Sequence, residues 1–279
     1  MPAPSVISNS RSKKRKKPKP EAASVDGEGG ATSNKLQKLN KDTAEAGGSP
    51  VNAFLRAWAW KREPLPDRYK YDLPYVHKFV SGGQEGSLTI QQKRFKETGF
   101  ASTVWDSSIV LAKYLERWQE ALVRGKRCIE LGAGCGLVGI CAARFGAGSV
   151  VLTDLPGNLS LLERNRSGNS TQDTQVSELV WGADVAHLEA PFDVVFATDV
   201  IYDGSVIHQL VATLIKLSNE RTRILIAYGR NRWAEKEFMD AIQLDFDVVE
   251  VGRELLDSVY ACDDVKMLSL TRLARRTPT

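Results

Sequence analysis

The sequence predicts an α/β protein with a Rossmann-like sheet of seven strands and helices on both faces. Two observations lead to this expectation. After about residue 100, short apolar runs alternate with stretches whose apolar residues recur at helical spacing, and such alternation is typical of a largely parallel sheet. A glycine-rich turn also follows the first of these apolar runs, where nucleotide-binding folds of this class begin their first helix.

The alternation can be placed along residues 101–279. The spacing of apolar residues predicts helices at about 105–123, 136–145, 159–165, 206–217 and 234–244. The apolar runs between them predict strands at 127–131, 149–153, 176–180, 192–197 and 223–227. Residues 248–251 and 267–273 are expected to end the domain as an antiparallel pair.

Residues 51–100 are expected to form an N-terminal extension of this domain. The aromatic and apolar side chains of residues 54–60 suggest either a short helix docked on the body or a partner-binding patch, and docking is favoured. Residues 69–79 and 88–95 have the composition of two short strands around a glycine-rich turn at 81–86. The extension should therefore carry a β-hairpin.

Residues 1–50 have the composition of a disordered basic tail. They hold ten Lys or Arg against five acids, whereas the other 229 residues hold 28 against 29, so the net charge of +4 arises from the tail. A segment with so few large apolar side chains cannot offset its ordering entropy. The basic run at residues 13–17 favours nuclear import over a nucleic-acid-binding arm or a plain solvated run. We therefore expect the protein in the nucleus, the cytoplasm or both.

Composition limits the class of the protein further. The chain is 42% apolar and 26% charged, and no apolar run approaches the roughly 18–20 residues of a membrane-spanning helix, so no membrane association is expected. The four Cys and three His are scattered without metal-ligand spacing, which indicates reduced core cysteines and no metal site. A nearly neutral body makes a nucleic-acid partner improbable, and a monomer is the default.

The glycine-rich turn is the first candidate binding site. Gly132, Ala133 and Gly134 follow the strand at 127–131, and glycines there permit a tight turn and a close backbone approach to a ligand. Asp154 ends the next strand, 22 residues after Gly132, where a carboxylate can accept hydrogen bonds from ribose hydroxyls. Glu130, near the end of the first strand, would suit a cationic ligand through a bridging backbone amide or water.

A rival interpretation uses the same glycines. Gly134, Gly136 and Gly139 match the dinucleotide fingerprint by letter, which would indicate an oxidoreductase. In that fingerprint, however, the first glycine lies directly at the strand end, and here that residue is Gly132. The register therefore favours S-adenosylmethionine, which has no pyrophosphate to bind.

Five short motifs give the chain a resemblance to a known family. They are TVWD at 103–106, ELGAGCGLVG at 130–139, LTD at 152–154, LVWG at 179–182 and DVIY at 199–202. In this order and spacing they resemble the methyltransferase-like 21 group of methyltransferase family 16. The similarity runs from about residue 88 to residue 273, and it implies that residues 101–279 are a class I methyltransferase domain.

The resemblance implies S-adenosyl-L-methionine as cofactor and a lysine side chain of another protein as substrate. It implies that Trp105 contacts the methionine end of the cofactor, that Asp154 binds the ribose and that Trp181 lies beside the adenine. The turn at 132–134 and the backbone of Thr198 are implied to contact the cofactor as well. Asp199 and Tyr202 match the family's Asp-x-x-Tyr motif and are the implied catalytic residues.

Simpler interpretations of these residues remain open at this stage. Trp105 and Trp181 could be core aromatics, Asp199 could cap a helix, and Tyr202 could pack against the sheet edge. The acceptor could also be a His or Arg side chain, or the chain could be a non-catalytic adaptor that binds S-adenosylmethionine.

Overall fold

The structure is a computed structural model that describes residues 73–93, 99–169, 171, 173–229, 234–261 and 263–274. The expected tail at 1–50 and the expected helix at 54–60 lie outside these residues. Among the described residues, no helix is long and apolar enough to cross a membrane.

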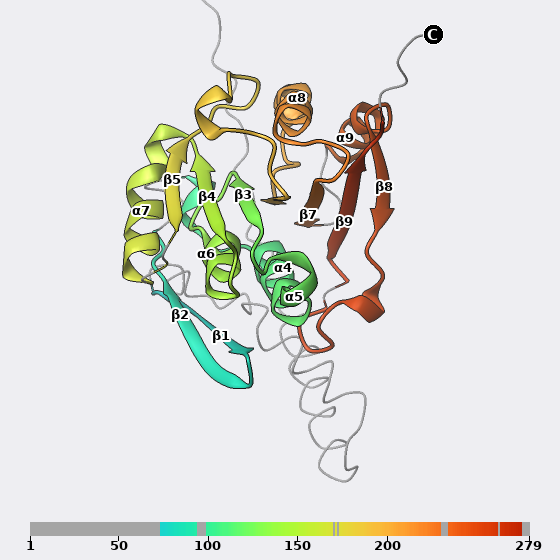
Figure 1. The fold of residues 1–279 in the computed structure, drawn as a ribbon. Coiled ribbons are helices and arrows are strands. Elements are labelled where there is room, and N and C mark those ends of the chain that lie inside the picture. Colours follow the sequence, from blue (N-terminus) through green and yellow to red (C-terminus); the bar gives the residue numbers. More distant parts are fainter. Residues whose placement is uncertain are drawn as a thin grey trace, which may run out of the picture. The chain divides into compact units, whose positions relative to one another are not determined.

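A seven-stranded sheet forms the centre of the fold, with strand order β5-β4-β3-β6-β7-β9-β8 (Figure 1). Five strands are parallel: β3 (Arg127–Leu131), β4 (Ser149–Asp154), β5 (Thr174–Glu178), β6 (Val194–Thr198) and β7 (Arg223–Gly229). The expected antiparallel pair is β8 (Phe246–Glu250) and β9 (Val265–Arg272). The predicted fold class is confirmed, with β9 also paired antiparallel to β7, so that the last strand lies inside the sheet.

Helices cover both faces of this sheet. One core cluster joins one face of the strands to α4 (Asp106–Arg117), α6 (Leu137–Arg144) and α7 (Leu159–Gly168). The other cluster joins the opposite face to α8 (Ile207–Leu217) and α9 (Glu235–Ile242). Strand side chains alternate between the two clusters: Cys128 and Val194 belong to the first, Ile129 and Val195 to the second. This period of two is what a buried strand produces.

The long helix expected at 105–123 is interrupted. It divides into α4 and α5 (Gln119–Leu122) at Trp118, whose φ of −113° and ψ of 21° are not helical. The Trp118 indole donates a hydrogen bond to Leu255 O at 3.0 Å, so a tertiary contact accompanies the break. Short 3-10 helices occur at Phe100–Ser102, Pro156–Asn158, Ala186–Leu188, Gly204–Val206 and Arg253–Leu255.

The expected N-terminal hairpin is present as β1 (Tyr75–Ser81) and β2 (Gln84–Ile90). Its turn is tighter than predicted, because Gly82 and Gly83 both take positive φ, 59° and 78°, the geometry of a two-residue hairpin turn. Gln84 therefore already pairs with Ser81, inside the span that the sequence assigned to the turn.

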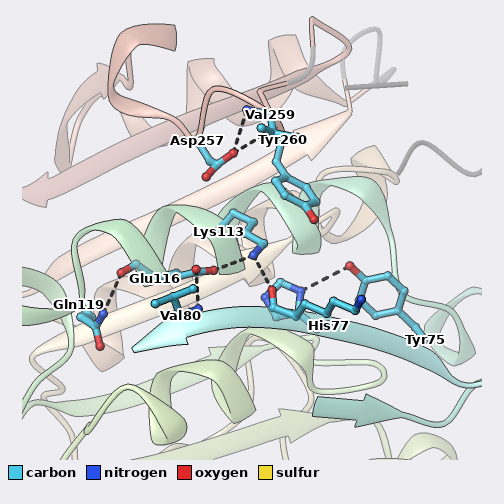
Figure 2. A network of polar contacts seen from close by, with 10 residues as sticks. Tyr75, His77, Val80, Lys113, Glu116, Gln119, Asp257, Val259 and Tyr260 are labelled. Carbon is cyan, nitrogen blue, oxygen red and sulfur yellow. Dashed lines mark hydrogen bonds and ion pairs between the residues drawn. The ribbon is translucent and has the colours of Figure 1, made fainter. Parts of the chain in front are cut away.

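A buried polar network fastens the hairpin to α4. The Lys113 ammonium donates to Lys78 O of β1 at 2.5 Å and to Glu116 Oε2 at 2.7 Å. Glu116 Oε1 accepts from the Val80 amide at 2.8 Å. Lys113 also lies 4.8 Å from the centre of the Tyr260 ring. Figure 2 shows these side chains gathered between β1, α4 and the turn that contains Tyr260.

Candidate active site

A cavity of about 850 Å³ lies at the carboxyl ends of β3, β4 and β6. Ligands of open α/β sheets bind at this edge, and the volume is within the range of small-molecule sites. The lining includes nine of the ten predicted site residues: Trp105, Gly132, Ala133, Gly134, Asp154, Trp181, Thr198, Asp199 and Tyr202.

The glycine turn is built so that side chains would not fit. Gly132 and Gly134 have φ of 59° and 56°, which L side chains rarely adopt. A Cβ on Gly134 would lie 2.7 Å from Ala101 O, and one on Gly132 would lie 3.3 Å from the Trp181 ring. Bare backbone therefore faces the cavity at these two glycines.

Asp154 connects β4 to this turn. Its Oδ2 accepts from the Gly134 amide at 2.7 Å. Its Oδ1 accepts from the Leu155 amide and from Asn158 Nδ2, each at 2.7 Å. The side chain is buried yet lines the cavity, and a carboxylate can accept about four hydrogen bonds. It therefore retains acceptor capacity for a ligand hydroxyl.

Glu130 is the predicted site residue that lies outside the cavity lining. It is 1% exposed and is not among the described residues that line the cavity. Its Oε2 accepts from the Gly139 amide in the first turn of α6 at 2.7 Å. Burial raises the pKa of the Glu130 carboxyl to about 8, an effect that the Gly139 hydrogen bond opposes and nearby Asp154 reinforces. A carboxyl that is largely protonated at neutral pH offers little charge to a cationic ligand.

Two tryptophans and one threonine occupy the cavity wall. The Trp105 indole donates to Phe100 O at 3.1 Å. Trp181 precedes a loop held by Gly182 N, which donates to Thr213 Oγ1 at 2.8 Å. Both rings are partly exposed and line the cavity, so neither is a fully buried core aromatic. Thr198 Oγ1 lies 2.8 Å from Ser108 Oγ, which fixes its side chain.

Asp199 is held in an unusual backbone conformation at the end of β6. Its φ is 52°, a region in which Asp and Asn are the more common non-glycine residues. Oδ1 accepts from the Gly229 amide at 3.1 Å, and Oδ2 accepts a short hydrogen bond from Ser107 Oγ. Asp199 does not cap the next helix, because Asp203 accepts from Ser205 N in that role.

Tyr202 lies at the mouth of the same cavity. Its side chain is 58% exposed, so it does not simply pack against the sheet edge. Partial desolvation raises the pKa of the Tyr202 phenol, and the charges of Asp203 and Asp154 raise it further. The phenol therefore stays protonated at neutral pH.

Sequence reasoning missed several residues that hold this wall in place. Ser107 and Ser108, in the first turn of α4, hold Asp199 and Thr198, and Asn158 holds Asp154. The sequence offered one indication of Ser107 and Ser108, because both directly follow the TVWD motif at 103–106. Among the described residues, no three His, Cys, Asp or Glu side chains gather as metal ligands.

Comparison with known proteins places this site in a family. The family described as lysine methyltransferase matches residues 83–245. The chain belongs to the lysine methyltransferase family. The protein N-lysine methyltransferase METTL21A of Danio rerio is 33% identical over 210 residues, covering 72% of this chain and 95% of that protein. METTL21A of Mus musculus is 33% identical over 194 residues, covering 67% and 88%. EEF1A lysine methyltransferase 3 of Xenopus tropicalis is 38% identical over 142 residues, covering 50% and 62%.

These matches confirm the family and the activity expected from the motifs. The chain is an S-adenosyl-L-methionine-dependent protein-lysine methyltransferase. The cavity fits this cofactor on its own geometry. It combines two glycines of positive φ in the turn at 132–134, an acidic side chain at the end of β4 and two aromatic rings in the wall.

Proposed function

We propose that Asp199 and Tyr202 form the methyl-transfer end of this lysine methyltransferase. The observation that carries the proposal is the placement of Asp199. Ser107 and Gly229 hold its carboxylate on the wall of the cavity, and Tyr202 lines the mouth of that cavity.

We further propose that the rest of the wall holds the cofactor. Asp154 accepts hydrogen bonds from the ribose hydroxyls of the cofactor. Trp181 lies beside the adenine, and Trp105 packs near the methionine end. The backbone of Gly132, Ala133, Gly134 and Thr198 meets the cofactor where side chains would obstruct it. Glu130 supports this wall indirectly, through its hydrogen bond to the Gly139 amide.

The acceptor amine determines what Asp199 has to do. S-adenosyl-L-methionine supplies an electrophilic methyl group on its sulfonium sulfur. A lysine ammonium has an unperturbed pKa of about 10.4 and no lone pair, so it must release a proton to solvent before its nitrogen can accept the methyl group, which leaves the cofactor as a neutral thioether. Burial in the channel lowers the lysine pKa, and Asp199 accepts an N–H hydrogen bond that directs the nitrogen lone pair. Tyr202 forms the channel wall and holds the amine in line.

The Asp199→Asn substitution tests this assignment. Asn tolerates positive φ and keeps the size of the side chain, so the variant removes the charge without the backbone cost of Ala. We expect turnover to fall at least about 100-fold, within the range of positioned acid–base groups, while S-adenosylmethionine affinity changes less than about threefold, or 0.7 kcal/mol. Methylation of lysate protein with labelled cofactor and calorimetric cofactor binding measure the two quantities.

Asp203→Asn provides the matched control. Asp203 is an exposed carboxylate four residues along the chain, and it caps a 3-10 helix, a role that Asn also fills. This control should methylate at the wild-type rate. Wild-type turnover by Asp199→Asn would overturn the proposed role.

The finer features of the partner and the location are also proposals. We propose that the enzyme acts as a monomer on a protein substrate, without membrane or nucleic-acid partners, in the nucleus, the cytoplasm or both. The nearly neutral charge of residues 51–279 supports the absence of a nucleic-acid partner, and the basic run at residues 13–17 supports the location. Light scattering of the full chain measures the oligomeric state.

A further inference from the structure

Two asparagines of α7 and its carboxyl end bind the backbone of the hairpin strand β2. Asn169 Oδ1 accepts from the Thr89 amide, and Asn169 Nδ2 donates to Thr89 O, both at 3.0 Å. Asn165, one helical turn earlier, does the same for Gln91, at 2.8 Å to its amide and 3.0 Å to its carbonyl. The two side chains thus pair with alternate residues at the end of β2, as a neighbouring strand would.

Asn165 makes one further contact that reaches the cofactor cavity. Its Nδ2 also donates to Cys135 O at 2.9 Å. Cys135 directly follows the glycine turn at 132–134 and lines the cavity. Asn165 is 1% exposed, and these bonds use both hydrogens of its amide group. The further bond of Asn169 instead goes to Asn165 O, within its own helix, at 2.8 Å.

The turn that Asn165 contacts needs outside support. Gly132, Gly134 and Gly136 all have positive φ, between 56° and 81°, and glycine gives a backbone more conformational freedom than any other residue. Without external contacts, such a segment loses conformational entropy when a ligand orders it. Hydrogen bonds that hold it beforehand reduce that cost.

The chain segment after β2 also supports another part of the cavity lining. Gln92 Oε1 accepts from the Val104 amide at 3.0 Å, and Lys93 N donates to Ser102 O at 2.9 Å. Val104 precedes Trp105, and both line the cavity. Asn165 therefore bonds directly to the lining residue Cys135, and it is linked to the lining residue Val104 through Gln91 and Gln92.

We propose that Asn165 is a positioning residue for S-adenosyl-L-methionine. It fixes the Cys135 carbonyl, and with it the glycine turn, in the conformation that binds the cofactor. It touches neither Asp199 nor Tyr202, so it acts on cofactor affinity and not on the methyl-transfer step. The hairpin end at Gln91 is the second anchor that holds the Asn165 amide in place.

The experiment compares Asn165→Ala with Asn169→Ala by calorimetric titration with S-adenosylmethionine. Each variant loses two hydrogen bonds to the hairpin end, at Gln91 for Asn165 and at Thr89 for Asn169, so both should unfold at a lower temperature in thermal melts. Only Asn165→Ala leaves Cys135 O without its side-chain donor. We expect its Kd to rise about tenfold, equivalent to 1.4 kcal/mol, and that of Asn169→Ala to rise less than twofold.

Asn165→Asp refines the comparison. The carboxylate can still accept from the Gln91 amide, but it cannot donate to Cys135 O or Gln91 O. This variant should bind the cofactor at least as weakly as Asn165→Ala, with KM for the cofactor raised and kcat at saturation within about twofold of wild type. If Asn165→Ala fails to fold, Asn165→Asp provides the same comparison with Asn169→Ala.

Three results would overturn the proposal. One is wild-type cofactor affinity in the folded Asn165 variants. Another is an equal loss of affinity in Asn165→Ala and Asn169→Ala, which would indicate general loosening of the hairpin. The third is a fall in kcat at saturating cofactor without a change in Kd.

Discussion

At the scale of single residues, the burial and hydrogen bonds of a side chain determine its charge state and its role near the cavity. Glu130 is an acid on the parallel strand β3, buried beneath the glycine turn and bonded to the Gly139 amide. The sequence identified this acid but not its direction. A side chain that points toward α6 and one that points into the cavity occupy the same position in a motif.

The Glu130 carboxyl should make folding stability depend on pH. Its pKa rises from 4.5 to about 8 on burial, so the folded chain retains a proton that the unfolded chain releases. Its contribution is fully present below pH 4.5 and is lost as pH rises toward 8, at up to about 1.4 kcal/mol per pH unit.

Thermal melts across this pH range check the prediction. Glu130→Gln should be closer to wild type at pH 5 and gain stability relative to it by pH 8. Glu178→Gln, an exposed position at the end of β5, should follow the wild-type curve throughout. A constant difference between Glu130→Gln and wild type would show that Glu130 does not titrate in this range.

Gly134→Ala should damage the cofactor site directly. The added Cβ would meet Ala101 O at 2.7 Å, and φ is 56°, which costs about 1 kcal/mol for a residue with a Cβ even without the clash. We expect at least about tenfold weaker cofactor binding and a lower melting temperature. Gly168→Ala, in α7 with nothing within 4 Å of the new Cβ, should bind like wild type.

At the scale of elements, most of the fold could be predicted because the spacing of apolar residues reflects which side chains of each helix or strand face the core. Strand β3 begins and ends where predicted, and α8 differs by one residue at its start. The break at Trp118 could not be predicted, because it coincides with a contact to Leu255, 137 residues away.

The position of β9 between β7 and β8 could not be predicted either, because apolar spacing does not determine which strands pair. The anchoring of the hairpin by Lys113, Asn165 and Asn169 was missed for the same reason.

The Lys113 network should contribute measurably to stability. The Lys113 and Glu116 side chains are 8% and 17% exposed, so Lys113→Met leaves a mostly buried carboxylate without its cation. We expect the free energy of unfolding to fall by about 2 kcal/mol. Adding Glu116→Gln should recover part of that loss, which a double-mutant cycle in denaturant measures.

A surface pair provides the comparison for this network. Lys236 and Asp240 form an ion pair with side chains 88% and 58% exposed, and solvent screens such a pair so that it contributes little to stability. Lys236→Met should therefore change the free energy of unfolding much less than Lys113→Met. Equal effects of the two substitutions would mean that the hairpin network contributes no more than a solvated pair.

At the scale of the whole molecule, the catalytic body and the basic tail have separate charge and, we propose, separate tasks. The tail carries a net charge of +5, and the remaining 229 residues carry −1. A body near neutrality has no long-range attraction for nucleic acid, so any location signal should depend on the run Lys13–Lys17. Replacing these five residues by Gln should abolish nuclear accumulation of a fluorescent fusion, while methylation and cofactor binding by the purified protein stay at wild-type levels.

The control replaces Lys35, Lys38 and Lys41 by Gln, which removes three tail charges outside the run. This control should leave the distribution of the fusion between nucleus and cytoplasm unchanged. If both replacements shift the distribution equally, tail charge in general is the cause and the short run is not a signal.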